Sequence, residues 1–90
     1  MLIPVYTKRF EKNISRCIKR GYDIELFKEI AVLLVEEMPL PPKCKVHKLI
    51  GEFANHWECH IKPDWLLIYR YDDVNKKVIF EDTGSHSDLF

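Results

Sequence analysis

The spacing of apolar residues changes along the chain and predicts a strand followed by a helix. Residues 2–6 are a short apolar run that contains Pro4. Proline cannot donate a backbone hydrogen bond, so this run predicts an edge strand or a strand with one unpaired side. From Thr7 onward the apolar residues recur at helical spacing. Thr7 is a suitable N-cap and Gly21 a suitable stop, which predicts a helix over residues 8–20.

A second helical pattern covers residues 24–37, with Asp23 placed as its N-cap. Its apolar stripe is wide for a helix on the protein surface, so we expect it to be the central core helix. The pair Met38-Pro39 prevents the helix from continuing. The short link Gly21-Tyr22 predicts that the two helices form an antiparallel pair.

The second half of the chain predicts three strands after a long connection. Residues 39–56 begin with a proline-rich segment and lack periodicity, so we expect a loop, with a short strand around residues 51–54. Residues 57–61 alternate between apolar and polar side chains, as in a strand with one buried face. Residues 65–71 are apolar almost throughout, which is typical of a central strand, and a turn leads into a third strand at residues 78–80.

These elements predict one α+β domain over residues 1–90. Their order is β-α-α-β-β-β, which favours an antiparallel helical hairpin on one face of a small, mostly antiparallel sheet. A composition of 47% hydrophobic and 12% aromatic residues is that of a globular chain. No apolar run approaches the roughly 20 residues that a membrane span needs, and the first residues do not resemble a signal peptide. We therefore expect a cytoplasmic protein with no membrane partner.

Charge and cysteines narrow the possibilities further. The net charge is zero, but residues 1–20 contain six basic residues and one acidic residue, whereas the rest of the chain is acidic. The basic face of the first helix is either a solvated surface or a surface for phosphates or an acidic partner. The odd number of cysteines, Cys17, Cys44 and Cys59, does not match a disulfide framework, so we expect free thiols.

The candidate chemistry centres on the segment His60-Ile-Lys-Pro-Asp64-Trp65, at the junction of two predicted strands. Pro and Asp favour a turn there, so the segment is either a plain hairpin connection or a place where side chains converge. His47, in the loop, and His86, in the tail, can meet beside Asp64 if the strands are neighbours. Imidazoles and a carboxylate suit general acid and base catalysis, because an unperturbed histidine titrates near about 6.5.

Lys48 and Lys62 lie next to these residues in the sequence and make a phosphate-bearing substrate plausible. Cleavage of RNA fits the set: a base removes the 2'-hydroxyl proton, the 2'-oxygen attacks phosphorus, and an acid protonates the leaving 5'-oxygen. This reaction requires no cofactor and no metal.

A zinc site is the competing interpretation. Cys44 and His47, and likewise His56 and Cys59, are thiol and imidazole pairs at zinc-like spacing. However, Cys59 should face the core together with its apolar neighbours, where cysteine is usually a small apolar filler. We therefore favour acid and base chemistry over zinc.

Several motifs identify a family. Together with the helical pair and the Pro-Leu-Pro segment ahead of the loop histidine, they resemble those of the YafQ-like toxins of the RelE/ParE superfamily, from bacterial type II toxin-antitoxin systems. The motifs are His47-Lys-Leu-Ile-Gly51, Cys59-His60-Ile-Lys-Pro-Asp64-Trp65-Leu-Leu-Ile-Tyr69 and Thr83-Gly84-Ser85-His86-Ser-Asp-Leu-Phe90.

The resemblance implies an endoribonuclease that cuts mRNA, typically on the ribosome, and is held inactive by a cognate antitoxin protein. Operator DNA would be bound only through the antitoxin. By position, the residues matching the catalytic set are His47, His60, Asp64 and His86, with His60 or His47 as base, His86 as acid and Asp64 as orienting or second proton-carrying group. Trp65 and Phe90 match positions that hold nucleotides or shape the pocket.

One position departs from the family pattern. Two residues before Gly84, where the family normally has an arginine that could hold a phosphate, this chain has Asp82. The exchange removes a bidentate donor and changes the local charge by two units, unless Lys48 or Lys62 compensates. This leaves an alternative: an attenuated toxin homologue that acts mainly as an antitoxin-binding module and co-repressor.

Overall fold

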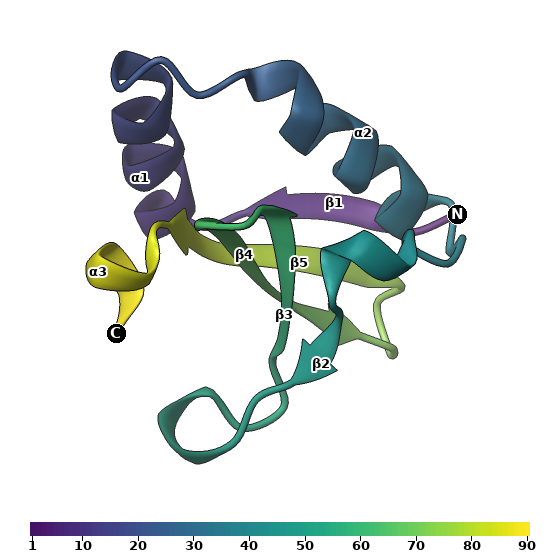
Figure 1. Ribbon diagram of the computed structural model, residues 1–90. Coiled ribbons are helices and arrows are strands. Elements are labelled where there is room, and N and C mark those ends of the chain that lie inside the picture. The colour runs from purple at the N-terminus through teal and green to yellow at the C-terminus, as the bar shows by residue number, and fades with distance from the viewer.

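A computed structural model describes residues 1–90 and shows a five-stranded sheet with two helices on one face (Figure 1). The strand order is β1-β5-β4-β3-β2, with β1 parallel to β5 and every other pair antiparallel. The strands are β1 (Ile3–Tyr6), β2 (His47–Lys48), β3 (Trp57–Lys62), β4 (Trp65–Asp72) and β5 (Lys77–Gly84). The helices are α1 (Lys8–Lys19), α2 (Ile24–Val35) and α3 (His86–Leu89), with 3-10 turns η1 (Pro42–Cys44) and η2 (Gly51–Phe53).

The two long helices begin at the predicted caps. The Thr7 hydroxyl accepts a hydrogen bond from the Phe10 amide at 3.0 Å, and the Asp23 carboxylate accepts one from the Glu25 amide at 3.0 Å. Gly21 has φ +92°, a conformation that favours glycine and ends the first helix. The helices diverge from this link, so that each covers a different part of the sheet (Figure 1). Neither is long and apolar enough to cross a membrane.

The core fills the space between the helices and the sheet. Aromatic rings from three elements meet there, with Phe10 at 5.2 Å from Phe27 and 5.8 Å from Phe80 between ring centroids. Such pairs contribute about 0.5–1.5 kcal/mol each beyond their buried area. The cysteines are free, as expected, and all three are buried. Cys59, on β3, belongs to this core cluster.

Three expectations for the second half of the chain were wrong in detail. Residues 51–54 are not a strand, because the amide of Ala54 bonds back to the Gly51 carbonyl and Gly51 has φ +74°. His47 is not in a loop but in the short strand β2, paired with Glu58 of β3.

The third predicted strand is also longer than expected. β5 continues to Gly84, because a bulge at Glu81 absorbs a register shift against β4. The tail then forms α3, where the Ser85 hydroxyl accepts from the Asp88 amide and the Asp88 carboxylate accepts from the Ser85 amide. The histidine of the tail therefore lies at the start of a capped helical turn.

Candidate active site

The face of the sheet opposite α1 and α2, which we call the open face, carries the polar residues of β3. Cys59 packs in the core between the sheet and the helices. Side chains alternate along a strand, so Glu58 and His60 point to the open face. The pairing of His47 with Glu58 places His47 beside them. Ile68 and Leu66, the ladder partners of Glu58 and His60 on β4, lie on the same face and are fully buried.

Two imidazoles share the carboxylate of Glu58. His47 Nε2 lies 3.2 Å and His60 Nε2 lies 3.9 Å from the same Glu58 Oε1. The other ring nitrogens face backbone carbonyls, with His47 Nδ1 at 3.0 Å from the Lys45 oxygen and His60 Nδ1 at 3.3 Å from the Pro63 oxygen. Glu58 is 5% exposed, so its carboxylate is largely screened from solvent. One carboxylate oxygen of Glu58 therefore faces a ring nitrogen of each imidazole.

His86 and Asp64 form a second pair at the other end of β3. The Asp64 Oδ1 accepts from the His86 backbone amide at 2.9 Å and contacts its Nδ1 at 2.6 Å. The hydrogen bond from the His86 backbone amide is the larger cause, and the one from the ring the smaller cause, of a pKa of Asp64 below its ordinary value. An ionised carboxylate only accepts, so the ring proton must be on Nδ1. Nε2 of His86 is left as the nitrogen that can exchange protons.

The two pairs meet between His60 and His86, whose ring centroids are 5.9 Å apart. Segments that are distant in the sequence thus bring the four expected catalytic residues into one cluster. The members are His47 from β2, His60 from β3, Asp64 from the β3–β4 turn and His86 from α3. Two adjacent imidazoles with separate carboxylate partners can take a proton from one substrate oxygen and give a proton to another.

Helix α1 fixes the position of α3, and hence of His86. The Asp88 carboxylate accepts from Arg20 Nη1 at 2.6 Å and Nη2 at 3.1 Å, and Arg16 lies 3.8 Å away. The hydrogen bonds from the Arg20 side chain are the main reason that the pKa of Asp88 is well below its ordinary value, and the hydrogen bond from the Ser85 amide is the second. Two of the basic residues of the first helix therefore serve an internal contact.

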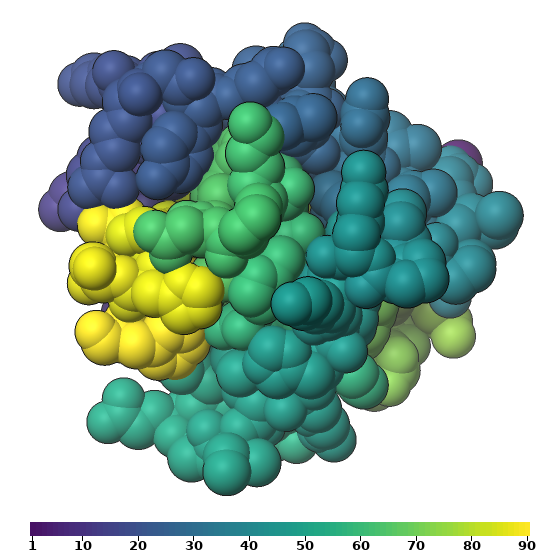
Figure 2. Space-filling view, viewed as in Figure 1, coloured from purple at the N-terminus to yellow at the C-terminus, as the bar shows by residue number.

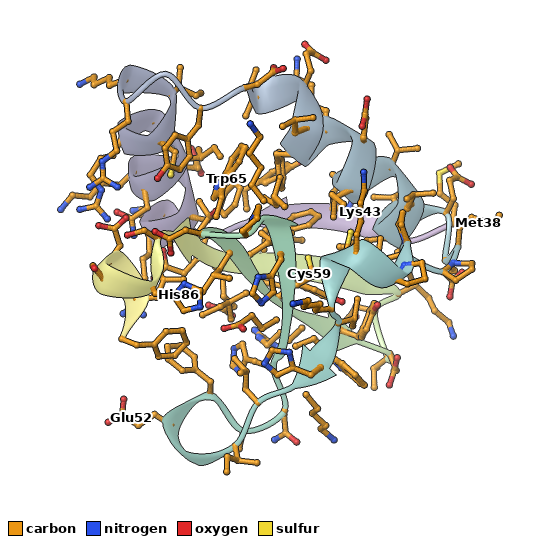
Figure 3. All side chains as sticks on the ribbon, in the orientation of Figure 1. Met38, Lys43, Glu52, Cys59, Trp65 and His86 are labelled. Atoms are coloured by element: carbon orange, nitrogen blue, oxygen red, sulfur yellow. The ribbon has the colours of Figure 1, made fainter.

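Trp65 lies in the core and not in the polar cluster. Its side chain is 2% exposed, packs against Tyr22 at 5.0 Å between centroids, and donates to the Thr83 hydroxyl at 2.9 Å. Figure 3 shows Trp65 between the sheet and the helices and His86 on the side of α3. In this conformation the indole of Trp65 offers almost no exposed surface on which a base can stack.

The other expected substrate-binding residues are spread around the cluster. Lys48 pairs with Trp57 on β3 and so points away from the open face. Lys62 ends β3 and is exposed. Phe90 is 65% exposed and lies edge-to-face with Phe53 of η2 at 6.1 Å between centroids. Of these three, Phe90 is the side chain with an exposed aromatic face beside α3.

Asp82 supplies no cation, and one oxygen of its carboxylate is engaged within the chain. Its Oδ1 accepts from Asn13 Nδ2 at 2.6 Å and from the Thr83 amide at 2.8 Å, and the residue is 7% exposed. Arg70, on the adjacent strand β4, is not a free substitute for the missing arginine as a phosphate ligand, because its Nε donates to Glu81 Oε1 at 2.7 Å. Near the end of β5 the chain therefore has a carboxylate where the family pattern has a cation.

The geometry does not favour zinc. Cys44 and Cys59 are in the core, whereas His47 bonds toward Glu58 and His56 lies 3.7 Å from Glu81. Burial raises the pKa of Cys59 to about 12, which disfavours the thiolate that zinc requires. No group of three or more histidine, cysteine, aspartate or glutamate side chains is arranged to hold a metal ion.

Comparison with known proteins gives the family. The family model described as "Bacterial toxin of type II toxin-antitoxin system, YafQ" matches residues 3–90. The chain belongs to the YafQ toxin family. Among its relatives is the mRNA interferase toxin YafQ of Escherichia coli strain K12, which is 36% identical over 86 residues covering 94% of this chain and 91% of that protein.

Solved structures of similar toxins confirm the α+β fold. A metal-bound toxin from Helicobacter pylori has a TM-score of 0.94 at 38% identity, with both chains covered completely. The YafQ chain of the E. coli DinJ-YafQ complex has a TM-score of 0.90 at 34% identity, covering 100% of this chain and 99% of that one. The H. pylori toxin is described as metal-bound, but the side chains here do not form a metal-ligand set.

Glu58 is the site residue that the sequence did not single out. The alternation of residues 57–61 places Glu58 and His60 on the same face, which was the available signal. A lone glutamate on a half-buried strand gives no indication that two imidazoles will meet it. That contact depends on β2, which places His47 across the ladder.

Proposed function

We propose that this chain is an endoribonuclease of the mRNA interferase type, which cleaves RNA through attack of the 2'-oxygen without a metal. The observation that carries the proposal is the 5.9 Å distance between the ring centroids of His60 and His86, with Glu58 facing the first ring and Asp64 the second. The names of its relatives as mRNA interferase toxins support the substrate class. Cleavage would take place on the ribosome or on free mRNA.

The proposed steps use only side chains of the cluster. His60 removes the 2'-hydroxyl proton through Nε2, and Glu58 stabilises the imidazolium that forms. The 2'-oxygen attacks phosphorus and the bond to the 5'-oxygen breaks. His86 begins this step as the imidazolium, with one proton on Nδ1 toward Asp64 and one on Nε2, and gives the Nε2 proton to the leaving oxygen. The products are a 2',3'-cyclic phosphate and a 5'-hydroxyl. Asp64 keeps the His86 ring in the tautomer and orientation that this transfer needs.

His47 has a supporting role in this scheme, as the second imidazole on Glu58. It is the alternative base if the substrate approaches from the side of β2. Phe90, beside α3, would stack on a base near the cleaved bond.

The test is cleavage of a labelled single-stranded RNA by the purified chain in EDTA. We expect products with cyclic phosphate ends, no cleavage at a 2'-deoxy linkage, and losses of about 100-fold or more for His60→Ala and His86→Ala. His56→Ala is the matched control, because His56 is the one histidine outside the cluster. Cleavage that survives both His60→Ala and His86→Ala would overturn the proposal.

The placement of Asp82 keeps the attenuated homologue as a second candidate. A carboxylate at the border of the site repels a phosphate where an arginine would bind it. Under this alternative the chain acts through a cognate antitoxin, as E. coli YafQ forms a complex with DinJ, and reaches operator DNA only through that antitoxin. Induction of the chain, of Asp82→Arg and of Asp82→Arg with His86→Ala separates the two. Growth arrest by the unmodified chain supports the nuclease, whereas arrest by Asp82→Arg alone supports attenuation.

A further inference from the structure

A basic cleft opens beside His60, on the side away from the acidic end of β5. It has a volume of about 430 Å³ and is lined by Leu26, Lys43, Lys45, His60, Ile61, Lys62 and Pro63. No acidic residue is among these lining residues. Figure 2 shows the β3–β4 turn, in green, with the yellow C-terminal segment on one side and the teal surface that includes η1 on the other.

The cleft exists because β3 has a free edge. The partner strand β2 is two residues long and pairs only with Trp57 and Glu58. The rest of β3, up to Lys62, therefore faces η1 and α2 with no neighbouring strand. His60 belongs both to this edge and to the polar cluster of the open face. The cleft therefore leads directly to the His60 imidazole.

Packing holds two of the lysines at the cleft. Cys44, between them in η1, is 1% exposed and belongs to the core cluster, whereas Lys43 and Lys45 are exposed. The carbonyl of Lys45 also lies 3.0 Å from Nδ1 of His47, which links the turn to the polar cluster. The third lysine, Lys62, is held at the end of β3. None of the three forms an ion pair within the chain.

We propose that Lys43, Lys45 and Lys62 bind the RNA backbone phosphates next to the cleaved bond and so set the path of the strand through the site. Unpaired ammonium groups around a cleft that no acidic residue lines form a phosphate site, whereas Asp82, near the end of β5, repels phosphate. The strand then leaves the cluster along β3 toward η1. This inference rests on the proposed RNA substrate, and it explains how the chain holds phosphates without the arginine that Asp82 replaces.

The test compares two triple variants with the same change in net charge. Lys43→Gln/Lys45→Gln/Lys62→Gln removes the lysines of the cleft. Lys28→Gln/Lys76→Gln/Lys77→Gln removes three lysines from α2, the β4–β5 turn and the start of β5. Binding of a single-stranded 2'-O-methyl RNA, which cannot be cleaved, is measured as a function of salt. Each phosphate contact on a single strand contributes a slope of about 0.7 in log K against log salt, so the cleft variant should lose about 2 in slope and roughly tenfold or more in affinity.

A neutral methylphosphonate in place of one phosphate locates the contact. Next to the cleavage point it should weaken binding by the unmodified chain but leave binding by the cleft variant unchanged. Equal salt slopes for the two triple variants would overturn the inference. If the unmodified chain cleaves RNA and the cleft variant keeps its KM and slope, only the cleft assignment fails. If the unmodified chain neither cleaves RNA nor binds the 2'-O-methyl strand, the proposed function and the cleft assignment both fail.

Discussion

The buried hydrogen bond between Trp65 and Thr83 predicts a loss of stability that one isosteric substitution can measure. Thr83 has no exposed surface, and its hydroxyl accepts from Trp65 Nε1 at 2.9 Å while it donates to the Leu66 carbonyl at 2.7 Å. Thr83→Val keeps the shape of the side chain and removes both bonds. The indole N–H is then buried without an acceptor, which costs about 1–3 kcal/mol.

We expect Thr83→Val to lower the free energy of unfolding by about 2 kcal/mol. In a domain of this size Tm falls by about 4–8 °C per kcal/mol, so the expected decrease is about 8–16 °C. Urea unfolding monitored by circular dichroism measures the free energy of unfolding, and calorimetry measures Tm. Thr83→Ser is the control, because it keeps the hydroxyl and loses one methyl group, worth about 0.8 kcal/mol.

The bond also connects the two halves of the His86–Asp64 pair, because Trp65 follows Asp64 and Thr83 precedes the turn into α3. RNA cleavage should therefore fall more in Thr83→Val than in Thr83→Ser. In a Trp65→Phe background the cost of Thr83→Val should shrink, since the donor is already absent. A Thr83→Val protein within about 0.5 kcal/mol of the unmodified chain would refute the reasoning, as would an equal loss with and without the indole.

Four further outcomes follow from the structure. The pKa of Asp88 is lower in the folded state than in the unfolded state, where it is about 4. Its contacts therefore stabilise the fold fully when the pH is above the unfolded-state pKa, and this stabilisation is lost as the pH falls toward the folded-state pKa. The stability difference between the unmodified chain and Asp88→Asn should thus be constant from about pH 5 to 8 and shrink below about 4, as urea unfolding at each pH would show; a constant difference throughout contradicts it. Glu58→Gln should slow single-turnover cleavage by about 100-fold with an unchanged melting curve, and full activity would remove Glu58 from the mechanism. Gly84→Ala would place a Cβ 2.8 Å from the Asp88 Cβ, so it should cost about 1–3 kcal/mol in thermal unfolding, whereas the exposed Ser87→Ala should cost little; equal Tm values would show that α3 can move away. Finally, the three buried thiols should react with a disulfide reagent only as the chain unfolds, because burial raises the pKa of Cys59 to about 12, and rapid labelling of the native protein at pH 8 would contradict their burial.

The periodic spacing of apolar residues predicted the two long helices and the central strands, because in these elements the buried side chains recur at a fixed interval along the sequence. The helices begin at Thr7 and Asp23 because a side-chain cap acts within a few residues. The turn at Pro63 and Asp64 was predicted for the same reason. β2 and α3 were not predicted, because elements of two and four residues are too short to show a periodic pattern. β2 exists through its ladder with β3, and α3 depends on a capping box that Arg20 supports from across the molecule.

The same distinction applies to the site. His47, His60, Asp64 and His86 were expected from their chemistry and from family motifs, and the structure brings them together. Glu58 was missed because its role depends on cross-strand register, and the core position of Trp65 depends on Thr83, whose partner was not visible in the sequence.

The sequence by itself determined which residues can carry the chemistry and which face of each strand or helix is apolar, because both follow from side-chain type and local period. Only the tertiary structure decided which of those residues meet. The ladder register, the bulge at Glu81 and the short length of β2 place two imidazoles on Glu58, turn Asp82 toward Asn13, and open the cleft beside His60. These are contacts between segments far apart in the chain, and local spacing carries no information about them.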